Sequence, residues 1–197
     1  MKRIFLILLL VAPILISAQK WQTNPVSISL FNNATMLPPA SLVAVFNQPI
    51  HPGFTAGYEF GWKEEGKHKW FQNVGLSYFY HRFAYQAIIL NSQAGYRWYA
   101  GKFSAEGYLQ AGYMHALYLT DRAVMQSDGT YVAKKGFGKP QFLTGLGLGV
   151  GYNFGSNDKL RRLFLNYDIR LQMPFVKNYV TLLPNGTLSV GMQFNLK

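Results

Sequence analysis

The chain has 197 residues, a formal net charge of +11, no cysteine, 16% aromatic residues and only 14% charged residues, where soluble domains average about 25% charged. The lack of cysteine excludes disulfides, thiolate chemistry and cysteine-containing metal sites. A mean hydropathy of +0.01, with no long apolar run beyond the N-terminal stretch, argues against a helical membrane protein. Many aromatic residues combined with few charges favour a barrel whose apolar residues are dispersed by alternation.

Residues 1–18 are predicted to be a secretory signal peptide. They contain the basic pair Lys2-Arg3, the apolar run Ile4–Ile16 and the small residues Ser17-Ala18, which is the usual order of charged, apolar and cleavage regions. The run is too short for a membrane anchor helix. Removal of the two basic residues leaves 11 − 2 = +9 on the exported chain.

Residues 19–40 show weak periodicity and contain several proline and asparagine breakers. They are therefore predicted to form a periplasmic N-terminal extension or a plug that enters the barrel. Ser41–Asn47 (SLVAVFN) is predicted to be a short first strand, so that the barrel domain spans residues 41–197. Gly53–Trp62 and Trp70–His81 follow as strands that alternate apolar residues with polar or small ones.

The strongest pattern lies in Ala87–Tyr118, which alternates apolar and polar residues over two long strands. A turn at Ala100-Gly101 would pair residues whose numbers sum to 201, and the two polar faces would then meet. Arg97 would lie opposite Ser104 and diagonal to Glu106, within reach of an ion pair. Long strands with an aliphatic middle, aromatic ends and a polar opposite face are typical of a transmembrane hairpin, with a sandwich hairpin as the alternative.

Three more strands are predicted after the long polar gap Leu119–Pro140, with Pro174–Gly186 as a second outer loop. Glycines 145, 147, 149 and 151 share the inward face of the first of them and leave room for a bulky neighbour such as Tyr108 or Phe79. The predicted fold class is therefore all-β, a single antiparallel transmembrane barrel of eight strands. Its long loops would lie outside the cell and its short turns in the periplasm. The three strands are Gln141–Phe154, Arg161–Met173 and Thr187–Lys197.

The last strand ends in VGMQFNLK, where Gly191, Phe194 and Leu196 resemble the C-terminal signal that the barrel assembly machinery reads. The additional Lys197 resembles the endings of Bacteroidota barrels. From about Ser41 onward the chain is similar to small bacterial outer-membrane barrels of the OmpA/OmpX-like kind. This resemblance implies an outer-membrane location in a Gram-negative envelope, with the assembly machinery as a partner during biogenesis.

The predicted inward face carries three acids and two arginines among amides, which indicates a lumen packed with paired polar side chains. An eight-stranded barrel is just wide enough to be filled in this way. A narrow conduit or a small-ligand cavity is the alternative. The candidate lumen network consists of Glu59, Arg97, Glu106, Asp168 and Arg170.

The basic residues are dispersed and gather mainly in predicted turns, which disfavours nucleic acid as a partner. Such turns are better suited to anionic lipid head groups and lipopolysaccharide phosphates. An extracellular partner cannot be read from the sequence. The turn clusters are Lys63, Lys67 and Lys69; Lys134, Lys135 and Lys139; and Lys159, Arg161 and Arg162.

No catalytic, metal or cofactor site is predicted, and the chain is expected not to be an enzyme. Ser77 and His81 share a strand face, but four residues separate them by roughly 13 Å, too far for a nucleophile and its base. His51 and His68 lie in predicted turns, and His115 has no evident serine or acid partner. The sequence favours a structural or loop-binding barrel over two alternatives, a narrow pore or small-ligand transporter and a lipid A-modifying enzyme.

Overall fold

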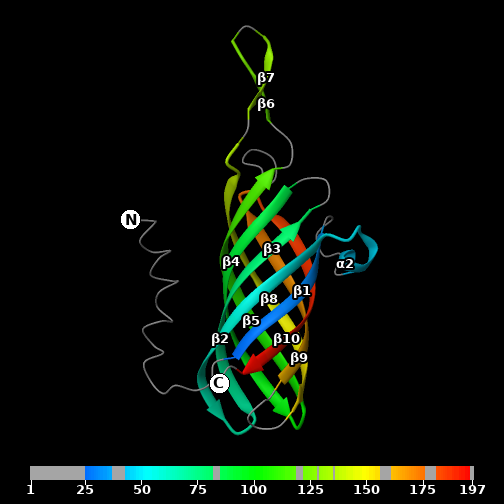
Figure 1. Cartoon of the computed structure of the whole chain (residues 1–197), viewed down its shortest axis with the longest axis vertical. Helices are drawn as coiled ribbons and strands as arrows, with labels where there is room; N and C mark the ends of the chain where they lie inside the picture. The colour runs from blue at the N-terminus through cyan, green and yellow to red at the C-terminus, as the bar shows by residue number, and fades with distance from the viewer. Residues whose placement is uncertain are drawn as a thin grey trace.

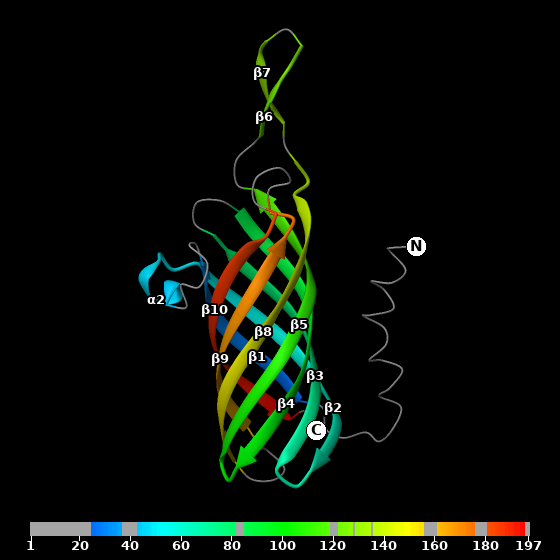
Figure 2. The same ribbon diagram turned by 180° about the vertical axis from the view of Figure 1, so that it is seen from behind.

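The computed structural model describes residues 25–36, 43–81, 85–118, 122–127, 129–134, 136–155, 161–175 and 181–195. Eight strands close into one antiparallel barrel in the order β1-β10-β9-β8-β5-β4-β3-β2 (Figures 1 and 2). The predicted fold class and strand count are confirmed. The strands are β1 (Pro25–Thr35), β2 (Pro52–Glu65), β3 (His68–Tyr80), β4 (Tyr85–Ala100), β5 (Phe103–Tyr118), β8 (Lys139–Phe154), β9 (Arg161–Met173) and β10 (Leu183–Asn195).

Two further elements lie outside the barrel sheet. The strands β6 (Arg122–Met125) and β7 (Tyr131–Lys134) form a separate two-stranded ribbon that projects from one end of the barrel (Figure 1). A single helical turn, α2 (Ala44–Asn47), lies between β1 and β2. Within the part of the chain that the structure describes, no helix has the length and apolar character needed to cross a membrane. The predicted signal peptide, residues 1–18, is outside the described residues.

The two ends of the barrel differ, and we name them by their connections. At the turn rim, β2 and β4 each connect to the following strand through two residues, and Gly66 and Gly101 take φ values of 60° and 63° there, a conformation that glycine adopts without steric cost. The described ends of the chain meet at the same rim, where Pro25 pairs with Asn195. The loop rim carries the β1–β2 connection with α2 and the β6–β7 ribbon (Figure 2).

The prediction for the N-terminal part was wrong in two places. Within residues 19–40, Pro25–Thr35 is neither an extension nor a plug but β1, which pairs with β10 on one side and β2 on the other. Within the predicted strand Ser41–Asn47, the structure places α2 instead. Short apolar runs fit either a strand or a helix by periodicity, so tertiary pairing decides between them.

The predicted register of the central hairpin was also wrong, although its faces were not affected. The turn consists of Gly101 and Lys102, so residues of β4 and β5 pair with numbers that sum to 203, and Arg97 lies directly opposite Glu106. A change of two in this sum moves each residue past one full side-chain repeat and leaves it on the same face. The last strand likewise begins at Leu183 rather than at Thr187.

The exterior of the wall is apolar, as alternation requires. Aliphatic side chains form its middle, and aromatic side chains stand near both rims. Trp62, Trp70 and Trp98 are exposed near the turn rim, and Tyr80, Tyr118 and Phe142 near the loop rim. The exposed aliphatic residues between them include Leu76, Leu90, Leu109, Leu148, Val150, Leu165 and Val190.

Candidate functional site

The interior of the barrel is divided into two halves of different chemistry. The half near the turn rim holds buried ions, which we call the charged cluster. The half near the loop rim holds a buried apolar group, which we call the apolar cluster. The charged cluster consists of Glu59, Lys69, Arg97, Glu106 and Arg162, and the apolar cluster of Phe31, Phe79, Tyr85, Ala87, Ile89, Met114, Ala116 and Leu143.

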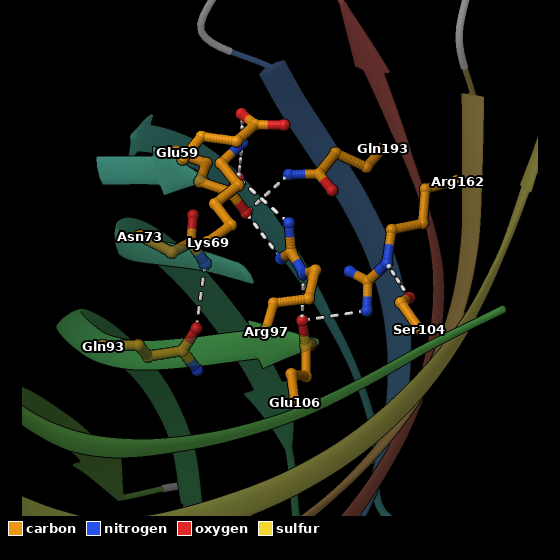
Figure 3. Close-up of polar contacts among 10 residues, drawn as sticks. Glu59, Lys69, Asn73, Gln93, Arg97, Ser104, Glu106, Arg162 and Gln193 are labelled. Atoms are coloured by element: carbon orange, nitrogen blue, oxygen red, sulfur yellow. Dashed lines mark hydrogen bonds and ion pairs between the residues drawn. The ribbon is translucent and has the colours of Figure 1, made fainter. Parts of the chain in front are cut away.

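Arg97, on β4, is the centre of the charged cluster (Figure 3). Its two terminal nitrogens donate to both carboxylate oxygens of Glu59, at 3.1 Å and 2.7 Å, and its Nε donates to Glu106 Oε2 at 2.6 Å. The guanidinium carbon lies 4.4 Å from the centroid of the Phe71 ring, a distance suited to a cation–π contact. A planar guanidinium with fixed donors can bridge two carboxylates in this way, whereas a lysine ammonium cannot.

Lys69, Arg162 and Gln193 make the remaining contacts to the two carboxylates. Lys69 Nζ lies 2.9 Å from Glu59 Oε1, and Gln193 Nε2 donates to Glu59 Oε2 at 2.8 Å. Arg162 Nη2 lies 2.8 Å from Glu106 Oε2, and Arg162 Nε donates to Ser104. The cluster therefore links β2, β3, β4, β5 and β9, and Gln193 connects it to β10.

Strand β8 presents glycines to the lumen, and these leave room for side chains from the neighbouring strands. A Cβ at Gly149 would lie 2.1 Å from Asn166 Oδ1, and a Cβ at Gly151 would lie 2.4 Å from Arg162 Nε. A Cβ at Gly147 would meet the Tyr108 ring at 2.4 Å. The inward glycines thus admit Tyr108, as predicted, but not Phe79, which packs against Phe31 and Tyr85 in the apolar cluster.

Asp168 and Arg170, the other two predicted network residues, form a separate group. Arg170 Nη2 donates to Asp168 Oδ2 at 2.9 Å, and the Tyr108 hydroxyl donates to Asp168 Oδ1 at 2.6 Å. Within the described ranges, neither residue of this pair forms a hydrogen bond or ion pair with the charged cluster. The structure therefore brings Glu59, Arg97 and Glu106 together and places Asp168 and Arg170 in a second ion pair.

Between these groups, the described residues of the lumen line a small cavity of about 50 Å³. One water molecule needs on the order of 10–15 Å³ measured in this way, so the space suits a few waters and no metabolite. Asn73, Asn91 and Arg170 line it, and each has one buried polar atom without a hydrogen-bond partner among the described residues. Towards the loop rim the lumen holds the apolar cluster, in which the Phe31 ring lies 2.2 Å from the Cβ position of Gly53.

Two residues of the charged cluster were assigned wrongly from the sequence. Lys69 and Arg162 were predicted to lie in turns that face lipid head groups, but both side chains are largely buried and pair with Glu59 and Glu106. The predicted turn before β3 was too long, because β3 begins at His68. Arg162 lies within β9, which begins at Arg161 as predicted. The parity of Arg162 with Asp168 and Arg170 was the signal that could have identified it.

The proposed C-terminal signal lies on β10 as far as the structure describes it. Gly191 pairs with Ser29 and Phe194 with Val26, both on β1. A Cβ at Gly191 would lie 2.5 Å from the Phe164 ring, so this glycine is also required for packing in the lumen. Leu196 is outside the described residues.

The histidines contact aromatic and backbone groups rather than a nucleophile. His51 stacks on His81 with ring centroids 3.8 Å apart, and His51 Nδ1 lies 3.1 Å from the Asn33 carbonyl oxygen. His115 contacts the Tyr113 hydroxyl and the Phe137 carbonyl, and Ser77 contacts Thr55. Across the described ranges, no three His, Asp or Glu side chains gather in a way that could hold a metal ion.

Comparisons with solved structures identify the kind of barrel. Neisserial surface protein A is 14% identical, with a TM-score of 0.52 over 89% of this chain and 98% of that one. The fold is that of the small eight-stranded outer-membrane barrels. The outer membrane enzyme PagL (9% identity, TM-score 0.47, 87% and 99% covered) and the N-terminal barrel domain of Pseudomonas aeruginosa OprF (15%, 0.42, 88% and 98%) are also similar. No protein-family model and no curated protein matches the sequence.

Proposed function

We propose that the protein is an integral outer-membrane barrel with a closed interior, which acts as a structural element of the envelope or through its outer segments. The observation that carries the proposal is the closure of the lumen by two independent groups, the charged cluster and the apolar cluster, around a cavity of about 50 Å³. A lumen closed in this way supports neither conduction nor transport of a solute.

The membrane location is supported by the exterior of the wall. Exposed aliphatic side chains between two sets of aromatic ones, on strands of 11 to 16 residues, are typical of an outward apolar band of about 25 Å with aromatic girdles. The turn rim then faces the periplasm and the loop rim faces the medium. Outer-membrane lipid and lipopolysaccharide are the proposed partners of the wall, and the barrel assembly machinery is the proposed partner during biogenesis.

The proposal includes the absence of catalysis. Lipid-modifying chemistry of the hydrolytic kind needs a nucleophile and its base within hydrogen-bond reach. Ser77 is hydrogen-bonded to Thr55 in the lumen, and His81 stacks on His51. Expression in a host with known lipid A should therefore leave the mass spectrum of that lipid unchanged.

Planar-bilayer conductance of the refolded protein tests the closed interior. Wild-type protein that shows heat-modifiable migration, and is therefore folded, should give no steady single-channel steps. The matched variants are Phe79→Ala and Arg97→Ala, which each open one of the two closures. Either single variant should remain silent because the other closure persists, and steps in wild-type protein that change on Arg97→Ala would overturn the proposal.

A further inference from the structure

The connection between β1 and β2 lies against the outer wall of the barrel. Residues 43–50, which we call the α2 segment, contain α2 and contact β1 and β10. Figures 1 and 2 both show α2 beside the wall, well below the β6–β7 ribbon. The segment thus covers part of the surface that the barrel would otherwise present to its surroundings.

One side of the α2 segment is packed on the barrel exterior. Ala44 and Val45 are buried with Ala34 and Met36, and the outward side chains of Tyr167, Ile169 and Leu188 pack against this group. Ala34 has the parity of Leu30 on β1, which faces outward, yet it is 0% exposed. The segment therefore covers this outward position of the wall, which would otherwise be exposed.

The opposite side of the segment is apolar and uncovered. Val43, Phe46 and Ile50 are 56%, 68% and 71% exposed. The wall on the two strands that the segment connects is also apolar, since Leu30 on β1 pairs with Phe54 on β2 and both are more than half exposed. The three side chains therefore add apolar surface to a segment that is itself packed on the outward face of the wall.

Hydrogen bonds from two side chains hold the segment to the end of β1, and within the segment the Phe46 and Gln48 N–H groups donate to the Val43 and Ala44 carbonyls at 3.0 Å. Asn32 donates to the Val45 carbonyl at 2.9 Å and accepts from the His51 N–H at 2.8 Å. Gln48 accepts from the Thr35 N–H at 3.1 Å and donates to the Thr35 carbonyl at 2.6 Å. These contacts fix the segment against the outer wall at the end of β1.

We propose that Val43, Phe46 and Ile50 insert among the acyl chains of the outer leaflet, so that the α2 segment anchors the loop-rim side of β1 and β2 in lipid. The inference rests on the proposed membrane location. Its supports are the packing of the segment on outward side chains of the wall, the exposure of the three apolar side chains, and the hydrogen bonds that hold the segment to β1. Transfer of an apolar side chain from water to an apolar environment is favourable, so insertion among acyl chains would stabilise this position of the segment.

Single cysteine variants test the proposal directly, because the chain has no cysteine of its own. Phe46→Cys is compared with Leu30→Cys on the wall and Tyr131→Cys on the β6–β7 ribbon, positions whose native side chains are 68%, 65% and 69% exposed. Each variant carries a nitroxide label in phospholipid vesicles, and its collisions with oxygen and with a water-soluble nickel chelate are measured. Heat-modifiable migration checks that each is folded.

The label at Phe46→Cys should resemble the one at Leu30→Cys, with an oxygen-to-nickel collision ratio several-fold above that at Tyr131→Cys. A water-like ratio at Phe46→Cys beside a lipid-like one at Leu30→Cys would overturn the anchor and leave the membrane location intact. A water-like ratio at Leu30→Cys would instead overturn the proposed function. Spin–spin broadening at Phe46→Cys that disappears on dilution with unlabelled protein would show that a second copy, and not lipid, covers the patch. Ile50→Cys provides an independent position on the same patch.

Discussion

The two halves of the lumen close the same barrel by different physical means. In the charged cluster, Arg97 is held by directed contacts to Glu59 and Glu106 from opposite sides. In the apolar cluster, buried side chains such as Met114 and Phe79 occupy the lumen by their volume. Removal of one partner from a buried ion pair destabilises the protein strongly, because a charge is left buried without compensation. An apolar core instead loses stability in proportion to the volume of side chain that is removed.

The largest effect is expected from Arg97→Met, which keeps the volume of the side chain and removes its charge. Glu59 and Glu106 would lose their shared partner while both remain buried, each with one cation, Lys69 or Arg162. The free energy of unfolding should fall by about 3–5 kcal/mol. Urea unfolding in lipid vesicles, followed by loss of heat-modifiable migration, measures the change.

Arg97→Lys is the matched control for this variant. It restores the charge but cannot donate to both carboxylates with fixed geometry, so its stability should lie between those of Arg97→Met and the wild type. If Arg97→Met lost less than 1 kcal/mol, the charged cluster would not be a directed closure, and the contrast between the two halves would disappear.

Met114→Ala is expected to have the next largest effect. Met114 is 1% exposed and lies within the apolar cluster, so truncation leaves a cavity and should cost about 3 kcal/mol in the same unfolding experiment. Met114→Leu nearly conserves volume and should cost less than about 1.5 kcal/mol. Equal losses in the two variants would show that volume is not what stabilises this half.

Tyr108→Phe should have a smaller effect. It removes the hydroxyl that donates to Asp168 at 2.6 Å and leaves the ring in place against Gly147. Hydrogen bonds to charged groups contribute about 1.5–3 kcal/mol, and Arg170 continues to neutralise Asp168, so we expect a loss near the lower end of this range. Tyr152→Phe, on the exposed exterior, is the control and should change stability little.

The smallest effect is a pH dependence at the loop rim. Burial, and then the charge of the stacked His51, lower the pKa of His81 below its ordinary value. His81 follows β3, outside the membrane-spanning strands. Below a pH of about 6.5, His81 binds a proton more readily in the unfolded chain than in the folded chain. The free energy of unfolding should therefore fall as the pH is lowered from 7.5 towards 5. His81→Phe should flatten this dependence, and an unchanged slope in that variant would assign it to other groups.

The faces of the strands could be predicted from the sequence, but the partners across the lumen could not. Alternation fixes which side chains point inward, and an error of two in the register sum does not alter it, as Arg97 and Glu106 show. The contact of Arg162 with Glu106 passes over the glycines of β8, which pairs with β5 on one side and β9 on the other, and it depends on the stagger of these strands. That arrangement follows from strand tilt and stagger, which no local pattern encodes.

The first strand was missed for a related reason. Asn32 and Asn33 resemble turn residues in the sequence, yet in the structure Asn32 binds the α2 segment, and Asn33 accepts a hydrogen bond from Thr187. Their polar groups are used by segments distant in sequence. A prediction from local sequence assigns such asparagines to a turn, because it does not include the distant groups that form hydrogen bonds with them.

The pairing of β1 with β10 has a kinetic consequence. Pro25 and Asn195 are partners across this seam, so the strand that is synthesised first has no neighbour on one side until the last strand is available. Contacts between segments so distant in sequence form slowly, and an unpaired strand edge is a template for aggregation while it waits. The chain is therefore most prone to aggregation between its synthesis and the closure of the seam, and a holding chaperone or a template for the open edges would act during that period.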